Sequence, residues 1–190
     1  MKKETRKEEI LKTAAHLFKE KGYSAVTMRD LANAMGIKAS SLYNHISSKQ
    51  AILQEIIIAI AEDFTSGMNA IVGTKANSLQ KLEMIITLHV NIAVKNADGL
   101  SALNSDWMHL ESKLDYYLQL RKDYEDNFKH ILELGIRNNE IKPVNSDVIV
   151  FTMLSTLRSL YLWIPKKKNL KHDELTMMLT KILLQGVNNN

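Results

Sequence analysis

Apolar side chains recur at every third or fourth position along most of this 190-residue chain, which is the spacing that buries one face of an α-helix. Near the N-terminus, Ile10, Ala14 and Phe18 follow this spacing, and Gly22 supplies a stop. The pattern predicts an all-α fold of about nine helices, over residues 5–21, 28–35, 39–45, 48–68, 78–96, 100–110, 113–139, 146–163 and 173–187.

Capping residues mark where several of these helices begin. Thr27 is a good N-cap for the second helix, and Ser47 and Gln50 stand at the N-cap and N3 spacing of a capping box for the fourth. This boundary predicts an N-terminal domain of three short helices, residues 1–47, and a larger helical domain, residues 48–190. We expect the final residues, 188–190, to fray.

Composition excludes several classes of chemistry. Seven glycines and two prolines leave few tight turns for a many-stranded β protein, and the absence of cysteine excludes disulfides and thiolate metal sites. The N-terminal residues mix charges of both signs and lack the apolar core of a signal peptide, so we expect a cytoplasmic protein. Residues 148–165 are apolar, but serines, threonines and an arginine interrupt them, and we expect no membrane span.

Positive charge is concentrated in the first quarter of the chain. The net charge is +4, yet residues 1–50 hold ten Lys/Arg against five Asp/Glu, while the remainder holds fifteen against sixteen. Phosphate neutralisation requires local rather than average charge. The distribution therefore predicts a polyanion-binding segment followed by a near-neutral helical body.

The second and third predicted helices have the spacing of a helix-turn-helix. Ala32 lets the two backbones approach, Gly36 takes a turn conformation that is costly for other residues, and Leu31, Ile37 and Leu42 fill a small core. In the alternative interpretation, the unit is a packing module in which Tyr43 is a core residue. In the functional interpretation, the third helix presents side chains suited to the base edges of a DNA major groove: Lys38, Ala39, Ser40, Tyr43 and Asn44.

These residues resemble a known family. The runs VTMRDLA at 26–32, GI at 36–37, SLYNH at 41–45 and SK at 48–49 are similar to the N-terminal domain of TetR/AcrR-type transcriptional regulators. The resemblance implies a small DNA-binding head and a larger body that binds a ligand and forms a dimer. Two departures stand out: Lys38 replaces a small hydroxyl residue, which removes a helix cap and adds a basic side chain, and Ile46 replaces a phenylalanine in the core of the head.

The resemblance also implies roles for individual residues. Thr27, Tyr43 and Lys49 would contact phosphates, and the side chains nearest base edges would be those of Lys38, Ser40 and Asn44. The full set of expected DNA-binding residues is Thr27, Lys38, Ala39, Ser40, Ser41, Tyr43, Asn44, His45 and Lys49.

The last two predicted helices are apolar on more than one face. A peripheral helix in a small monomer needs one apolar stripe, so a second stripe predicts burial against a second subunit. We therefore expect a two-fold homodimer formed through residues 146–163 and 173–187. A single large core helix would explain one of these segments but not both.

Large side chains with polar tips are frequent between residues 78 and 163, as in pockets for small apolar ligands. The alternative is that these residues are ordinary core, where aromatic residues and methionines at helical spacing usually lie. Arg158, inside an apolar helix, needs a partner, either a carboxylate such as Asp106 or Glu111 or an acidic ligand group. The expected ligand-binding residues are Met84, His89, Trp107, Met108, Tyr117, Tyr124, Phe128, Phe151, Arg158 and Trp163.

An enzyme is the remaining alternative, and it would require a metal or acid–base site at His89, Asp106 and His109. No phosphate-binding loop, nucleophile elbow or two-histidine metal motif is present, so we expect no cofactor. The sequence predicts a non-enzymatic repressor that leaves a pseudo-palindromic, double-stranded DNA operator when a small hydrophobic or amphipathic ligand binds. A DNA-binding protein that does not respond to a ligand, and whose body recruits a protein partner, is the second hypothesis.

Overall fold

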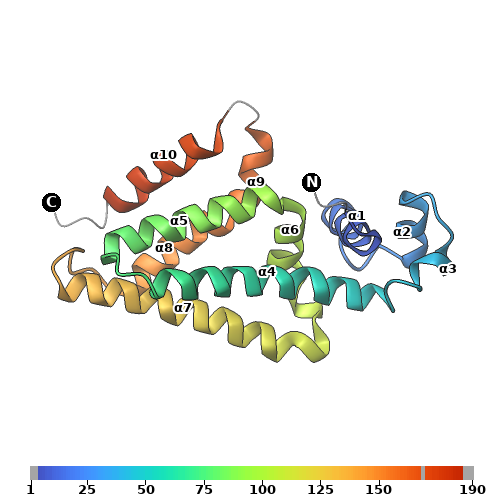
Figure 1. The fold of residues 1–190 in the computed structure, drawn as a ribbon, viewed down its shortest axis with the longest axis horizontal. Coiled ribbons are helices and arrows are strands. Elements are labelled where there is room, and N and C mark those ends of the chain that lie inside the picture. Colours follow the sequence, from blue (N-terminus) through green and yellow to red (C-terminus); the bar gives the residue numbers. More distant parts are fainter. Residues whose placement is uncertain (1–3, 168–169, 186–190) are drawn as a thin grey trace. The chain divides into compact units, whose positions relative to one another are not determined.

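A computed structural model describes residues 4–167 and 170–185, which form helices joined by turns, with no β-strand among them (Figure 1). The expected all-α fold is confirmed. The α-helices are α1 (Arg6–Lys21), α2 (Met28–Ala34), α3 (Ala39–Leu42), α4 (Lys49–Val72), α5 (Ser78–Lys95), α6 (Ala97–Ser105), α7 (Leu114–Arg137), α8 (Ser146–Arg158), α9 (Leu160–Trp163) and α10 (His172–Gln185). Three short 3-10 helices are η1 (Trp107–His109), η2 (Glu111–Lys113) and η3 (Ile164–Lys166). The expected frayed tail, 188–190, and the predicted end of the last helix at 187 lie outside the described residues.

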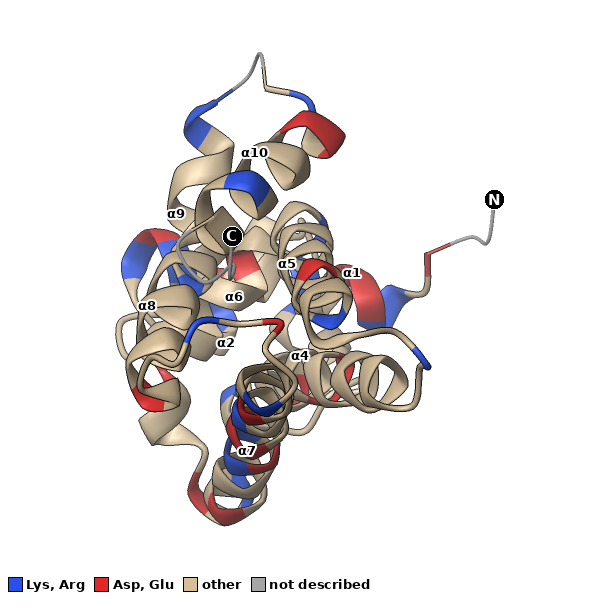
Figure 2. Cartoon of the chain, turned by 90° about the vertical axis from the view of Figure 1, so that its left-hand side faces the viewer, with Lys and Arg blue, Asp and Glu red and all other residues tan. Residues whose placement is uncertain are grey.

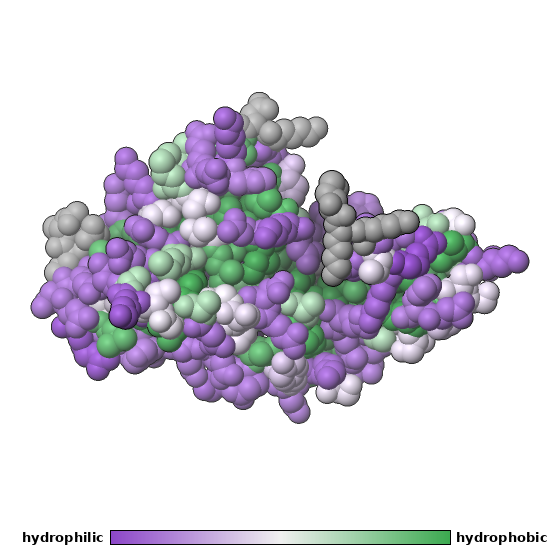
Figure 3. Space-filling view, viewed as in Figure 1, coloured by the Kyte–Doolittle hydropathy of each residue, from purple (hydrophilic) through white to green (hydrophobic). Residues whose placement is uncertain are grey.

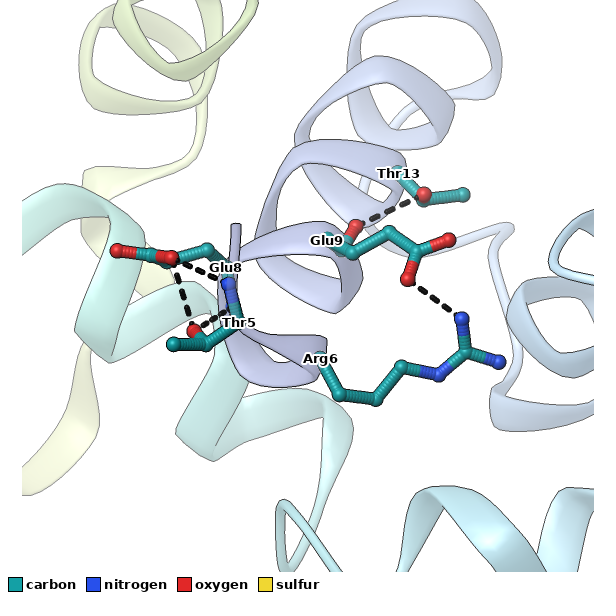
Figure 4. Close-up of polar contacts among 5 residues, drawn as sticks. All are labelled: Thr5, Arg6, Glu8, Glu9 and Thr13. Atoms are coloured by element: carbon teal, nitrogen blue, oxygen red, sulfur yellow. Dashed lines mark hydrogen bonds and ion pairs between the residues drawn. The ribbon is translucent and has the colours of Figure 1, made fainter. Parts of the chain in front are cut away.

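The first helix begins at a capping box (Figure 4). The Thr5 hydroxyl accepts a hydrogen bond from the backbone N–H of Glu8 at 3.2 Å, and the Glu8 carboxylate accepts one from the backbone N–H of Thr5 at 2.7 Å. These bonds satisfy donors that a helix N-terminus leaves unpaired. The predicted apolar face is buried at Ile10 and Phe18, and the helix ends at Gly22.

The turn between α2 and α3 explains the glycine that the sequence places there. The N–H of Ile37 donates to the carbonyl of Ala32 at 3.0 Å, and the N–H of Gly36 donates to the carbonyl of Asn33 at 3.1 Å. These are the paired bonds of a Schellman motif, which requires a residue in the left-handed region after the helix. Gly36 occupies that region with φ of 64°, where a side chain would be strained.

The core of the head contains most of the residues that the sequence pattern selects. Leu31, Ala32 and Leu42 are buried, and so is Ile46, whereas Ile37, which was expected in this core, is half-buried. Isoleucine at position 46 therefore fills a core position in place of the aromatic residue that the resemblance led us to expect.

The fourth helix begins one residue later than the capping-box pattern predicts. α4 starts at Lys49, and the Ser48 hydroxyl accepts a hydrogen bond from the backbone N–H of Ala51 at 3.0 Å. Ser48 therefore caps α4. The predicted capping box between Ser47 and Gln50 is wrong, because the Gln50 side chain bonds partners outside the helix.

Two predicted helices are interrupted, in each case where polar side chains compete for backbone groups. The segment expected to be helical from 146 to 163 breaks at Ser159, after hydroxyls have bonded carbonyls four residues earlier at Thr152, Thr156 and Ser159. Such bonds bend or end helices. The segment expected over 100–110 ends at Ser105, because the run at 104–106 consists of poor helix formers, and η1 follows.

The described residues form two compact units. The first lies within Met1–Ala61 and Asn96–Tyr117, and the second within Glu62–Lys95 and Leu118–Asn190. In the first unit, α1 packs along α6, and α2 packs against α1 and α3. In the second, α5 packs against α8, α9 and α10. This partition differs from the expected division after residue 47, which stays a prediction about the DNA-binding domain.

One segment passes a length and composition test for a membrane span. Residues 146–166 have a mean hydropathy of 1.4 in their most apolar window, and 33% of that window is buried. Exposed apolar residues on this segment also suit a helix that another protein surface covers, so the test alone does not assign it to a membrane.

Candidate DNA-binding surface and ligand-binding residues

The short third helix presents its polar side chains to solvent. Tyr43 is 55% exposed, so it is not a core residue, and Ser40, Asn44 and His45 are exposed as well. Ala39 and Ser41 are partly exposed. A surface of small and hydrogen-bonding side chains on one short helix can approach base edges without steric hindrance.

Lys38 stands at the N-cap of α3, as its departure from the family pattern led us to expect. Its backbone is extended, with φ of −74° and ψ of 143°, and its side chain makes no capping hydrogen bond. The side chain is exposed, so its charge faces solvent at the start of α3.

Thr27 is exposed but its hydroxyl has a partner within the chain. Its Oγ1 accepts a hydrogen bond from the backbone N–H of Asp30 at 3.1 Å and donates one to the Asp30 carboxylate at 2.6 Å. The side-chain and backbone hydrogen bonds from Thr27 lower the pKa of Asp30. A phosphate at Thr27 would therefore compete with an existing cap.

Lys49 also has partners within the head. Its Nζ donates to the carbonyl of Tyr23 at 2.8 Å and to that of Ser24 at 3.4 Å, and it lies 4.3 Å from the centre of the Tyr23 ring. Lys49 thus ties the start of α4 to the corner between α1 and α2. An ammonium group has three donors, so these contacts leave capacity for a phosphate.

Tyr23 is a structural residue that the sequence pattern did not single out. Its ring lies 5.2 Å from that of Phe18 and 5.2 Å from that of His109, and its hydroxyl donates to Gln50 at 2.6 Å. Gln50 and His109 are distant from Tyr23 in sequence, and helical periodicity carries no signal for such partners.

A buried polar pair lies in the second unit. His89 Nε2 is 2.8 Å from the Tyr124 hydroxyl, and the Phe64 ring lies 4.7 Å from that of His89. Burial lowers the pKa of His89 to about 3, with a further contribution from the charge of Arg158. Burial likewise raises the pKa of Tyr124 against the opposing effect of Arg158. Both side chains are therefore neutral at physiological pH. The sequence analysis did not predict that Phe64 is a neighbour of this pair.

The partner of Arg158 is Glu125, and neither Asp106 nor Glu111 as expected. The guanidinium donates to the Glu125 carboxylate at 2.6 Å, and Arg121 donates to the same oxygen at 3.2 Å. Burial raises the pKa of Glu125, but the hydrogen bonds and charges of the two arginines outweigh it, and the pKa lies below its ordinary value. Glu125 is one helical turn from Arg121 but 33 residues from Arg158, so only the first pairing is visible as a sequence pattern.

The remaining expected ligand-binding residues are divided between the two units. Trp107 stacks on buried Tyr117 in the first unit, with ring centres 6.0 Å apart. Met108, also in the first unit, is exposed; in the second unit Phe128 is buried, while Met84, Phe151 and Trp163 are exposed, Phe151 by 72% of its surface. Helical periodicity places residues on faces, but it does not tell which face meets another helix.

An open groove of about 720 Å³ lies between the second half of α4 and α5. Its apolar lining includes Ile71, Met84 and Leu88, and the acidic Glu83 lines it as well. Leu88 packs directly on Gly67, where an added Cβ would lie 2.6 Å from the leucine. Figure 3 shows hydrophobic residues gathered where these two helices run side by side.

Within the described part of the chain, no cluster of three or more His, Asp or Glu side chains is arranged to hold a metal ion. His89 belongs to the second unit, whereas Asp106 and His109 belong to the first. The Asp106 pKa is raised by burial, against the opposing effect of His109.

α2, the Schellman turn and the exposed, polar α3 have the arrangement of the helix-turn-helix motif of DNA-binding proteins. Residues 10–56 match the family model described as bacterial regulatory proteins, tetR family, and residues 75–187 match the tetracyclin repressor-like C-terminal domain. The chain belongs to the TetR family, whose members are transcriptional regulators and not enzymes.

Individual relatives agree with this assignment. The chain is 35% identical over 141 residues to the HTH-type transcriptional repressor KstR2 of Mycobacterium tuberculosis, covering 73% of this chain and 70% of the relative. It is 27% identical over 157 residues to the nucleoid occlusion factor SlmA of Vibrio vulnificus, covering 80% of each. The solved structure of the ketosteroid transcriptional regulator KstR2 of M. tuberculosis superposes with a TM-score of 0.92 at 22% identity, covering 100% of this chain and 98% of that one.

Proposed function

We propose that this protein is a homodimeric, ligand-responsive repressor of the cytoplasm, which binds a pseudo-palindromic double-stranded DNA operator and leaves it when a small hydrophobic or amphipathic ligand binds. The observation that supports the DNA-binding part of this proposal is the exposed polar surface of α3 and its N-cap residue Lys38. KstR2 relatives are described as repressors, which supports the direction of regulation.

The residues of the head divide by chemistry into two groups. Lys38, Ser40 and Asn44 offer donors and acceptors to base edges, flanked by Ala39, Ser41 and His45. Tyr43 and Lys49 offer a hydroxyl and an ammonium group to phosphates, and Thr27 would do so from the start of α2. The first group would set sequence preference and the second would position the protein on the duplex.

The homodimer proposal rests on an exposed face without charges. Along α8 and α9 the exposed positions 148, 151, 152, 155, 159 and 162 form one stripe of apolar and hydroxyl residues, and α10 exposes Met177, Met178 and Ile182. The only charges on α8 are Asp147 and Arg158, near its two ends, whereas α7 is banded with both signs along its length (Figure 2). Large exposed apolar surfaces usually mark protein interfaces.

Two of the three hydroxyl groups on this stripe already have partners. The side chains of Thr152 and Ser159 donate to the carbonyls of Val148 and Ser155, so neither carries an unpaired proton into an interface. A second copy of the same stripe would bury it symmetrically. This occupant also accounts for the apolar segment at 146–166 without a membrane.

The second unit supplies chemistry for the ligand. His89 and Tyr124 are neutral hydrogen-bonding groups among aromatic neighbours, and the charge of Arg158, which is paired with Glu125, lowers the pKa of both. A hydrophobic molecule with a polar group could exchange partners with this set. KstR2 of M. tuberculosis is described as a ketosteroid transcriptional regulator, and this description supports a hydrophobic ligand with polar groups.

The test begins with DNA selected by the purified protein from a random-sequence pool. The selected duplex then serves as a probe for release by a panel of small hydrophobic molecules, measured by fluorescence anisotropy. We expect enrichment of an inverted repeat and release by at least one compound. No enrichment would contradict DNA recognition, and an enriched operator that no compound releases would favour the non-responsive alternative.

A further inference from the structure

Two glutamines on successive turns of α4 hold the segment that joins α6 to α7. Gln50 Nε2 donates to the carbonyl of His109, and Gln54 Nε2 donates to the carbonyl of Leu110 at 2.9 Å. We call residues 107–113 the 107–113 connector. Leu110 is fully buried, so the connector is fixed by an apolar side chain as well as by two adjacent carbonyls.

The same Gln50 side chain also contacts the head. Its Oε1 accepts a hydrogen bond of 2.6 Å from the Tyr23 hydroxyl, at the corner between α1 and α2. Burial of Tyr23, with the nearby charges of Glu111 and Asp106, raises its pKa, so the hydroxyl stays protonated and remains a donor. One amide group therefore bonds the head through its oxygen and the connector through its nitrogen.

We propose that Gln50 is a positioning residue for DNA recognition, which holds the α1–α2 corner and the 107–113 connector together in the arrangement that binds the operator. This inference rests on the proposed function. Because the amide reaches Tyr23 and His109 together, a connector that moves away pulls Gln50 from the head or leaves a carbonyl unpaired. The connector leads directly into α7, which also carries Tyr124 and Glu125, so it is placed to pass on a change in that helix.

Thermodynamic reciprocity gives this proposal a second observable. If the position of the connector changes the affinity for DNA, then DNA binding must change the connector by the same coupling free energy. Trp107 begins the connector, and Trp163 is the only other tryptophan in the chain. A Trp163→Phe parent therefore reports fluorescence from the connector alone.

The experiment uses two duplexes, one selected by the wild-type protein from a random pool and one unrelated. In the Trp163→Phe parent we compare Gln50→Ala, Tyr23→Phe and the double variant. The matched control is Gln119→Ala, because the Gln119 amide donates only within its own helix, to Asp123 at 2.7 Å. Affinity for both duplexes, its salt dependence and Trp107 emission are measured for each.

We expect Gln50→Ala to weaken binding to the selected duplex about tenfold, because both hydrogen bonds of the bridging amide are lost. The affinity for the unrelated duplex should change less than about twofold. Tyr23→Phe should weaken it about threefold, and the double variant should be no weaker than Gln50→Ala, because both remove the same bond. The selected duplex should change Trp107 emission in the parent and in Gln119→Ala but not in Gln50→Ala.

Three results would overturn the inference. Gln50→Ala could bind the selected duplex as tightly as the control, it could lose both duplexes equally through general loss of structure, or it could keep the Trp107 response. If the wild-type protein selected no sequence at all, the proposed function would fail and the inference with it. If selection succeeded and Gln50→Ala matched the control, the inference alone would fail.

Discussion

His89 is a buried group whose ionisation opposes folding. Burial and the charge of Arg158 lower its pKa to about 3, whereas a histidine in the unfolded chain titrates near its ordinary value of 6.5. Between these two pH values the unfolded state binds the extra proton, so stability must fall as the pH falls. The free energy of unfolding falls with falling pH because folding lowers the pKa of this basic group.

His89→Gln should therefore make the free energy of unfolding depend less on pH below about 6.5. Glutamine can still bond the Tyr124 hydroxyl but does not titrate. Below pH 6.5 the wild-type free energy of unfolding should fall by about 1.4 kcal/mol per pH unit relative to the variant. Urea unfolding at a series of pH values measures this difference, and parallel curves for the two proteins would refute it.

Lys49 and Asn44 should give different thermodynamic signatures in DNA binding. Lys49→Ala should weaken binding to every duplex and lower the salt slope by about one unit, because a phosphate contact is lost. Asn44→Ala should cost about 1 to 3 kcal/mol on the selected duplex and leave the salt slope unchanged. Salt titrations of both variants test the pair.

The intrachain contacts of Lys49 add a requirement to that test. Since its Nζ also holds the Tyr23 carbonyl, Lys49→Ala should lower the stability of the head as well, so binding is compared below the unfolding temperature. A changed base preference with an intact salt slope would show that the proposed docking orientation is wrong.

Local signals in the sequence were sufficient for some residues and not for others. Thr27 and Gly36 act through neighbours three to five positions away, so capping and turn chemistry predict them directly. Gln50 has the right spacing for a cap, yet it bonds Tyr23 and His109 instead. A distant partner can displace a local one at similar free energy, and no spacing rule shows which wins.

At the scale of elements, the exposed stripe of α8 gives a sharp test of the homodimer. Phe151→Glu places a charge on the most exposed large apolar side chain of that stripe, where an interface would have to desolvate it. We expect light scattering to show about half the wild-type mass. Gln119→Glu adds the same charge to α7 and should leave the mass unchanged.

Leu183 is a weaker position for the same experiment. It is partly buried within the chain, so a charge there would disturb the fold as well as the interface, whereas Ile182 beside it is 69% exposed. If the wild-type protein were monomeric at micromolar concentration, or if Phe151→Glu kept the dimer mass, the assigned interface would be wrong.

Helix positions followed from periodicity better than helix ends and faces did. The apolar spacing located α1, α5 and α7 to within two residues at either end. It carried the eighth predicted helix across Ser159, where side-chain hydroxyls break the backbone pattern. It also led us to expect Phe151 and Trp163 in a ligand pocket, and both are exposed in the chain. A second apolar face looks the same in sequence whether it meets a ligand, the core or another subunit.

At the scale of the whole molecule, the proposed function requires two chains and a DNA of matching symmetry. A two-fold dimer presents two recognition helices, and they read successive major grooves only if the half-sites lie about one helical turn, or a multiple of it, apart. A ligand that binds one arrangement of the body more tightly would then shift the population away from that spacing.

The most direct test of this account is the sequence and stoichiometry of the DNA that the wild-type protein selects. We predict an inverted repeat with half-site centres about 10 base pairs apart or at a multiple of that distance, bound by an even number of chains. Sequencing the selected pool and measuring the mass of the complex give both quantities. A single unrepeated site bound by one chain would contradict the account.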